Sequence, residues 1–211
     1  AASVHGDGNT DYVGGGLLGR FDFAPSGPGN FHLEASCRAG QVDNAYDSSD
    51  LRGPGGRKAE YYSSSAYYGF HFGAGYLWNI NEALSLDLYG KYFWTRQEGD
   101  SLRLSTDDPV KFKDADSSRL RGGARLAYAL NERFKPYIGA AYEHEFDGRA
   151  RASTNGFSLP APSLEGGTGI GELGFTLRHS ASLPLSFDLG VQGYTGTREG
   201  VTGSLQFKLE F

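Results

Sequence analysis

The sequence predicts an all-β fold, an antiparallel transmembrane β-barrel of the outer-membrane type, and three observations support this prediction. Segments of about ten residues alternate apolar with polar side chains, as strands do when one face meets lipid and the other a watery lumen. Short turns and long polar segments separate these strands in alternation. Among the 211 residues are 32 Gly, 13 Tyr and 14 Phe, yet no apolar run of about 18 residues, which excludes a transmembrane helix.

The net charge, the single cysteine and the first residues each support one expectation about the chain. The net charge is −5 and the Lys and Arg residues form no runs, so a nucleic-acid partner is not expected. Cys37 is the single cysteine and is interpreted as a small lipid-facing side chain. The first residues have neither a basic start nor an apolar core, so they are not a signal peptide. If the protein is exported, we therefore expect its reading frame to begin upstream of Ala1.

Four strands are predicted in the first half of the chain, over residues 12–23, about 31–38, about 65–80 and 84–94. In the third of them, Phe70 and Phe72 belong to an outward apolar face, and His71 and Gly73 to an inward face. Trp78, Trp94 and Tyr128 lie near the ends of predicted strands, where barrels carry girdles of aromatic side chains.

Five more strands follow, over about residues 119–130, 134–146, 169–178, 185–196 and 200–211. The last has the clearest alternation. Its polar face carries Thr202, Ser204, Gln206, Lys208 and Glu210, and its apolar face carries Val201, Gly203, Leu205, Phe207, Leu209 and Phe211.

The connections predict an orientation. Residues 43–63, 98–117 and 147–167 are polar and are interpreted as long, mobile loops, whereas the connections near 24–30, 80–83, 130–134 and 179–184 are short. Outer-membrane barrels place short turns in the periplasm and long loops outside, so Phe211 is predicted at the periplasmic face. Nine strands are an odd number, and complete bacterial barrels have an even number. We infer that strands are missing upstream.

Several segments resemble the C-terminal translocator, or β-domain, of autotransporters, the type V secretion proteins of Gram-negative bacteria. The segments are YYGFHFGAGYLWNI (67–80), LDLYGKYFWTRQEGDSLRL (86–104), SSRLRGGARLAY (117–128), KPYIGAAYEHEFDGRA (135–150), SLEGGTGIGELGF (163–175) and GVQGYTGTREGVTGSLQFKLEF (190–211). The resemblance covers nearly the whole chain from about Gly14. It implies a barrel of about twelve strands, plugged by an upstream helix and preceded by a secreted passenger.

The resemblance also implies domain limits, a function and a location. Residues 1–211 are expected to form a single β-barrel domain that shows about nine of twelve strands and lacks its first strands, plug helix and passenger. Its implied role is to anchor the passenger in the outer membrane and assist its export to the cell surface. The implied partners are outer-membrane lipid, the β-barrel assembly machinery, and the chain's own passenger and plug helix. Phe207, Leu209 and Phe211 resemble the signal that this machinery reads; otherwise they form an ordinary lipid-facing strand end.

Charged side chains fall on the predicted inward faces of neighbouring strands. Because adjacent strands lie about 4.8 Å apart, such side chains can form salt bridges across the lumen wall. The charges either stiffen the wall or line a hydrophilic pore that holds a helix or a passing peptide. The predicted lumen-lining residues are Arg119, Arg121, Arg125, Glu143, Glu145, Glu172, Lys208 and Glu210.

No catalytic, cofactor-binding or metal-binding residue is predicted, and we expect no enzymatic activity. Residues 14–19 match GxGxxG without the strand-to-helix unit that a dinucleotide site needs. His32, His71 and His144 fall on separate strands without the spacing of metal ligands. Self-cleavage by Glu143, Glu145 or Glu172, as in some autotransporters, would need an Asn in the missing helix.

Two alternative functions remain open on the sequence alone. One is a small stand-alone porin or adhesin whose loops bind a partner. The other is a surface enzyme built on a barrel, for which His144 beside Glu145 is the only local candidate pair.

Overall fold

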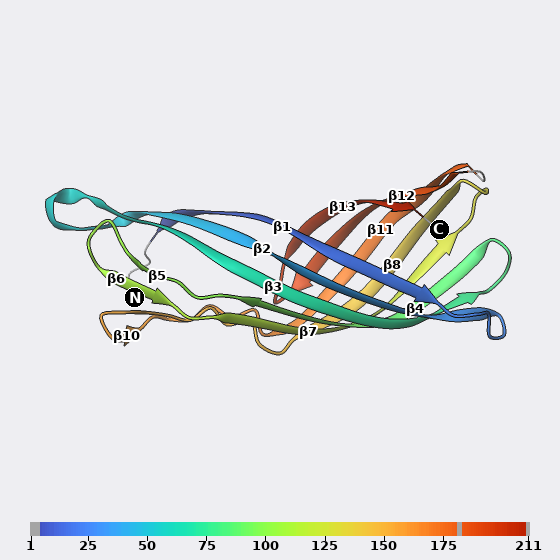
Figure 1. Cartoon of the computed structure of the whole chain (residues 1–211), viewed down its shortest axis with the longest axis horizontal. Helices are drawn as coiled ribbons and strands as arrows, with labels where there is room; N and C mark the ends of the chain where they lie inside the picture. The colour runs from blue at the N-terminus through green and yellow to red at the C-terminus, as the bar shows by residue number, and fades with distance from the viewer. Residues whose placement is uncertain (1–4, 181–182, 210–211) are drawn as a thin grey trace.

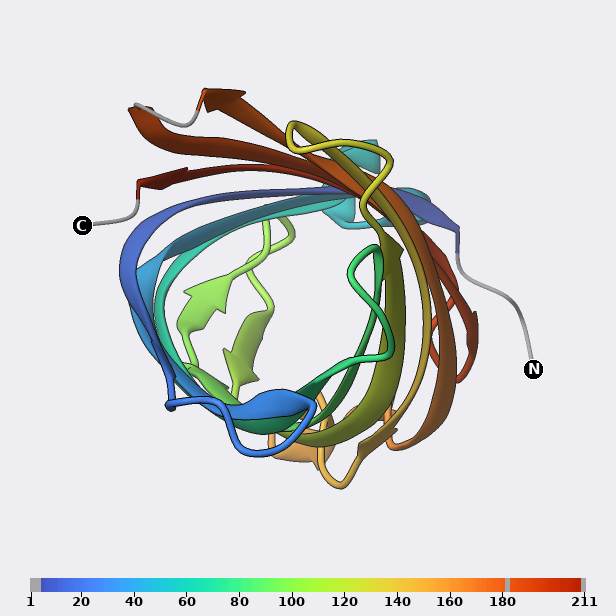
Figure 2. The same ribbon diagram turned by 90° about the vertical axis from the view of Figure 1, so that its right-hand side faces the viewer.

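The computed structural model describes residues 5–180 and 183–209, and most of them form one antiparallel sheet of nine strands that curls into a barrel-like wall (Figures 1 and 2). Each strand pairs with the next one along the sheet, in the order β1-β2-β3-β4-β7-β8-β11-β12-β13. This confirms the predicted fold class. The strands are β1 (Gly6–Asp22), β2 (Gly29–Arg52), β3 (Lys58–Asn79), β4 (Leu84–Gln97), β7 (Ala115–Tyr128), β8 (Phe134–Glu145), β11 (Gly166–Ser180), β12 (Leu183–Gly196) and β13 (Gly200–Leu209).

The outward face of the sheet is apolar, and the face inside the curl is polar. Phe70 and Phe72 of β3 point outward and are 48% and 52% exposed, whereas Ser63 and Ser65 of the same strand are buried on the inner face. Among the described residues the buried hydrophobic side chains are only Ala59, Val110, Tyr137 and Ile170. The protein therefore lacks a conventional apolar core over the part that the structure describes, and its apolar surface forms an outer band suited to lipid.

The prediction of a long loop after the second strand is wrong. Most of residues 43–63 extend β2 and β3 into one long hairpin, closed by the short 3-10 turn η1 (Pro54–Gly56). In this extension Tyr46 stacks on Tyr61 across the strands, with ring centroids 5.6 Å apart. Polar residues occupy both faces of the hairpin because both faces lie beyond the apolar band. The sequence there consequently lacks the apolar alternation that predicts strands.

The other two predicted loops are also partly strand. Residues 98–117 contain β5 (Ser101–Arg103), β6 (Pro109–Phe112) and the start of β7, and residues 147–167 contain β9 (Ala152–Thr154), β10 (Phe157–Ser158) and the start of β11. The four short strands form a second sheet in the order β10-β9-β6-β5. The β9–β10 turn is Asn155-Gly156, with φ of 48° and 84°, the conformation that a tight two-residue hairpin requires.

Asp114 ties the base of this second sheet to the main wall. Its carboxylate accepts a hydrogen bond of 2.9 Å from the Gly99 backbone N–H and forms an ion pair with Arg96. The Gly99 N–H and the Arg96 charge lower the pKa of the Asp114 carboxyl below its usual value. The group therefore stays ionised, and keeps both contacts, to a lower pH than an ordinary aspartate.

The opposite end of the wall carries the short connections, and we call it the short-turn end; it lies at the right of Figure 1. Two of its turns are held by the same arrangement of hydrogen bonds from the backbone to an asparagine side chain. Asn81 Oδ1 accepts the backbone N–H groups of Ala83 and Leu84 at 2.9 and 2.8 Å, and Asn131 Oδ1 accepts those of Arg133 and Phe134, both at 2.9 Å. These amide side chains hold the β3–β4 and β7–β8 turns tight.

The outer edges of β1 and β13 pair with no other strand within the described residues. In lipid such edges are costly, because each unpaired backbone N–H or C=O has no water to bond. We therefore predict that residues 1–211, refolded alone in detergent, will be poorly stable and readily degraded by protease. A compact, protease-resistant monomer in that experiment would contradict the prediction. The same protein purified from outer membranes, in the form that the cell makes, is the control.

Candidate functional site

The polar inner face holds three groups of interacting charges, of which the largest surrounds Glu143 on β8. Glu143 is 3% exposed and lies directly opposite Arg121 of β7 in the strand register. Arg121 Nε and Nη2 donate to Glu143 Oε2 at 2.9 and 2.7 Å. Arg119 Nη1 lies 3.5 Å from Glu143 Oε1, and Arg198 Nη2 lies 2.9 Å from the same oxygen. One carboxylate is thus surrounded by three guanidinium groups.

Glu145, two residues further along the same strand face, fixes the backbone where β7 begins. Its carboxylate accepts hydrogen bonds from Ser117 Oγ at 2.5 Å, the Ser118 N–H at 2.7 Å and the Asp147 N–H at 3.1 Å. Arg119 Nε lies 3.7 Å from its Oε2. Glu145 therefore joins the end of β8 to the start of β7 through the backbone as well as through charge.

Aromatic rings support the arginines of this group. The guanidinium carbons of Arg119 and Arg121 lie 5.4 and 5.1 Å from the centre of the Phe93 ring on β4. Arg198 lies over Tyr194, at 4.5 Å from the ring centre. Such contacts favour a cation held against the wall rather than one extended into solvent.

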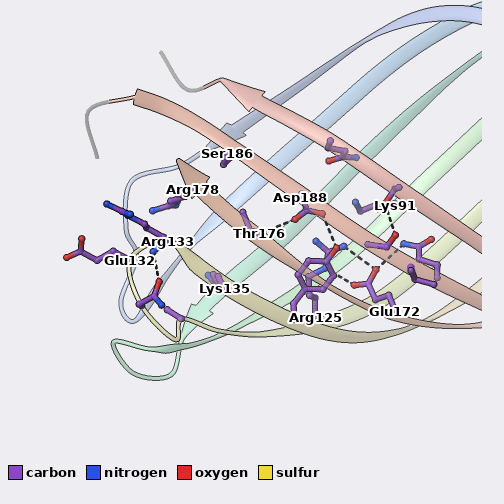
Figure 3. Close-up of a pocket in the computed structure, with 18 residues that line it drawn as sticks. Lys91, Arg125, Glu132, Arg133, Lys135, Glu172, Thr176, Arg178, Ser186 and Asp188 are labelled. Carbon is purple, nitrogen blue, oxygen red and sulfur yellow. Dashed lines mark hydrogen bonds and ion pairs between the residues drawn. The ribbon is translucent and has the colours of Figure 1, made fainter. Parts of the chain in front are cut away.

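A second group spans four strands nearer the short-turn end (Figure 3). Arg125 of β7 binds Glu172 of β11 through two hydrogen bonds, of 2.6 and 3.1 Å, and Gln192 of β12 donates to the same carboxylate at 3.0 Å. Arg125 also lies over the Tyr137 ring at 4.3 Å, and the Tyr137 hydroxyl donates to Asp188 at 2.9 Å. The paired fork geometry makes this ion pair both strong and well oriented.

A third group joins β2, β3 and β4. Glu34 contacts Lys91 Nζ at 2.5 Å and His71 Nε2 at 3.0 Å. His32, which is 2% exposed, contacts Asp87 through Nε2 at 2.8 Å. The Glu34–Lys91 and His32–Asp87 pairs each join β2 to β4 across the intervening β3, so they tie non-adjacent strands together.

The structure brings six of the predicted lumen-lining residues into these groups: Arg119, Arg121, Arg125, Glu143, Glu145 and Glu172. Of the other two, Lys208 is described in its backbone alone and Glu210 lies outside the described residues. Sequence reasoning missed Arg198, which comes from the turn between β12 and β13, because a turn has no periodic pattern to predict its direction. It also missed His32, Glu34 and Lys91 as partners, since their pairing depends on register across two strands.

The predicted aromatic girdle residues lie on the outward face at two levels. Trp78 and Tyr128 are 43% and 48% exposed near the short-turn end. Trp94 lies toward the other end of the apolar band and packs on Tyr68 and Phe70, with ring centroids 5.8 and 5.4 Å apart. Their membrane role stays a prediction.

The predicted assembly signal is described only in part. Phe207 is 65% exposed and meets Phe187 edge-on, with ring centroids 5.2 Å apart. Leu209 is described in its backbone as the last residue of β13, and Phe211 lies outside the described residues.

Among the described residues, most charged side chains in these three groups form ion pairs rather than a catalytic or metal-binding arrangement. Glu143, Glu145 and Glu172 each contact at least one arginine, and Glu34 contacts a lysine and a histidine. The candidate enzyme pair does not converge, since Glu145 belongs to the inner face while His144 packs edge-on against Phe146, at 4.7 Å. No group of three His, Cys, Asp or Glu among the described residues could hold a metal ion. Over the same residues, no helix is long and apolar enough to cross a membrane.

Comparisons with known proteins give a matching family model and similar solved structures. The family model described as the autotransporter beta-domain matches residues 2–190. The transport unit of the autotransporter AIDA-I from Escherichia coli is similar in structure, with a TM-score of 0.54, 15% sequence identity, and coverage of 98% of this chain and 84% of that one. At this identity the likeness shows the fold alone. A search of curated proteins gives no match.

Replacing Glu143 tests whether its ion pairs stabilise the wall. We predict that Glu143→Ala, which leaves three guanidinium groups facing one another, will destabilise the barrel by about 3 kcal/mol, the low end of the cost of breaking a buried ion pair. Urea unfolding in detergent of protein purified from outer membranes measures the change. Glu132→Ala, at an exposed carboxylate in the β7–β8 turn, is the matched control. Equal stability of the two variants would contradict the prediction.

Proposed function

The chain belongs to the autotransporter β-domain family, and from that premise we propose how its two faces serve export. It is a translocator barrel that exports a passenger domain. The observation that supports our proposal for its mechanism is the contrast between the faces. An outer band of exposed aromatic and aliphatic side chains surrounds an inner face of paired charges. We propose that lipid covers the first and that the second lines the path of the passenger.

The proposed location and orientation follow from the connections. The family is one of the Gram-negative outer membrane, and barrels of that membrane turn their short connections toward the periplasm. We assign the short-turn end to the periplasm and the β2–β3 hairpin with the second sheet to the cell exterior. In this orientation β1 and β13 both run from outside to inside.

The inner face is suited to a passing polypeptide because its charges are already paired. A free buried charge would bind opposite charges on the passenger and hold them. Arg125 and Glu172 instead form a neutral pair, and Arg119, Arg121 and Arg198 contact the carboxylates of Glu143 and Glu145. These side chains present a polar wall whose cations each contact a carboxylate. We propose that this wall admits a hydrated peptide, or the helix that follows the passenger, without retaining it.

We propose that the complete domain contains more strands than the nine of this sheet. We propose that residues 1–211 form a single β-domain, and that about three further strands, a plug helix and the passenger precede them. The unpaired edges of β1 and β13 support this, because additional strands between those edges would close the sheet. The odd number of strands in the sheet also supports it.

The last strand is the proposed contact with the β-barrel assembly machinery. Its edge is free within the described residues, and Phe207 exposes its ring on the apolar face. We propose that Phe207, Leu209 and Phe211 together form the signal. As to catalysis, the family is a transport domain, and we propose that this one has no enzymatic activity of its own.

The direct test of export is a surface-display experiment. We expect an epitope-tagged reporter placed upstream as the passenger to become accessible to external protease in intact Gram-negative cells. A reporter without the barrel should stay protected. Reporter that remains inside the cell although the barrel has reached the outer membrane would contradict the proposed function.

A lysine on the outward face tests the lipid contact. Phe72→Lys places a charge in the apolar band, and we predict that it will destabilise the barrel by about 2–4 kcal/mol and reduce its amount in outer membranes. Tyr62→Lys is the control, since Tyr62 lies on the same face of the same strand but outside that band. If both variants accumulate equally, the outward face does not contact lipid as proposed.

A further inference from the structure

A cluster of basic residues surrounds the short-turn end of the inner face, and we call it the mouth cluster: Arg133, Lys135 and Arg178. These residues line a cavity of about 500 Å³ that extends inward to Arg125 and Glu172 (Figure 3). Arg133 belongs to the β7–β8 turn, Lys135 to β8 and Arg178 to β11. The cluster therefore sits where the cavity opens toward the short turns.

The mouth cluster carries unpaired cations, whereas the cations deeper in the cavity contact carboxylates. Deeper, Arg125 pairs with Glu172 and Lys91 pairs with Glu34, while the Asp188 carboxylate accepts the Tyr137 hydroxyl without an ion-pair partner among the described residues. At the mouth, no carboxylate among the described residues forms an ion pair with any of the three cations.

Two acidic residues close to the mouth cluster form no ion pair with it. Glu132 belongs to the same turn as Arg133 and also lines the cavity, but it forms no ion pair with any of the three cations. Asp87 lies within electrostatic range of Lys135 and is held by His32 at 2.8 Å. The mouth thus has a net positive charge that its surroundings leave largely uncompensated.

The backbone holds these like charges close together. The Arg178 N–H donates to the Arg133 carbonyl at 2.8 Å, and Lys135 lies opposite Thr176 in the register. Like charges on neighbouring positions of a sheet repel one another, which is unfavourable unless an anion joins them. Ser186 lies opposite Arg178 in the register, so its hydroxyl and that of Thr176 line the cavity at the level of the cations.

We propose that the mouth cluster binds a carboxylate-rich segment of polypeptide as it enters the barrel. This inference rests on the proposed function and specifies which stretch of a passing chain is held, and where. Guanidinium groups bind carboxylates through paired hydrogen bonds, and the lysine adds a point charge. Because the deeper charges are paired, an acidic segment has no equally cationic site beyond the mouth. It is therefore held at the entrance and released inward when a neutral segment follows.

The test measures binding of a fluorescent hexaglutamate peptide by anisotropy to protein purified from outer membranes in detergent. The triple variant Arg133→Gln, Lys135→Gln and Arg178→Gln removes the mouth cluster. The control variant Arg52→Gln, Arg57→Gln and Lys111→Gln removes equal charge from the opposite end, where the structure pairs none of the three with a carboxylate. We expect the mouth variant to bind about tenfold more weakly and the control variant to bind normally.

Two further peptide measurements define the ligand. Hexaglutamine should not bind, and inorganic phosphate at equal charge concentration should displace hexaglutamate poorly. The proposal is overturned if the unaltered protein shows no saturable binding, if both triple variants weaken binding equally, or if phosphate competes as well as the peptide does. Surface display of the reporter separates this inference from the proposed function. Normal display without peptide binding refutes the mouth site alone, whereas failed display refutes export itself.

Discussion

Backbone hydrogen bonding is the constraint on which the rest of this structure depends. A chain that crosses lipid must pair its own N–H and C=O groups, because the hydrocarbon offers no water to bond them. Within the described residues, seven of the nine strands meet this requirement on both edges by pairing with their neighbours along one continuous antiparallel sheet, and β1 and β13 meet it on one edge. Since successive side chains in a strand point to opposite faces, the same pairing places one half of the side chains outward and the other half inward. The apolar outer band and the charged inner face are both products of that alternation.

The inner face accommodates bulky polar side chains because glycines lie beside them. A Cβ atom at Gly75 would come within 2.4 Å of His32 Nε2, and one at Gly139 within 2.4 Å of Glu172 Oε1. Tyr137 likewise lies over Gly174, where a Cβ would meet its hydroxyl at 2.5 Å. Large side chains can therefore lie flat against the wall instead of filling the central space. Many of the glycines give this face its charge network and its openness at the same time.

The sequence predicts those features that depend on one strand or on two adjacent strands. The nine strands and the pairing of Arg121 with Glu143 follow from a period of two residues and from adjacent strands. The long β2–β3 extension does not, since both of its faces are polar. Asn155-Gly156 is a strong hairpin signal that polar composition concealed. The contact of Arg198 depends on the direction of a turn, and that of His32 depends on register across several strands. Neither can be predicted from the sequence of a single segment.

The length of the β2–β3 hairpin has a geometric consequence for the cell surface. With 22 residues, β3 is roughly 70 Å long, against about 30 Å of hydrocarbon, so even a tilted strand rises well above the lipid. The Phe112 ring of β6 packs against Tyr61, with centroids 5.5 Å apart, and braces the hairpin from the inside. The rim of the barrel therefore rises higher at the β2–β3 hairpin than elsewhere. A chain emerging beside the tall side would have a polar β-surface along one flank and open water along the other, so its first steps of folding would take place against a directional scaffold.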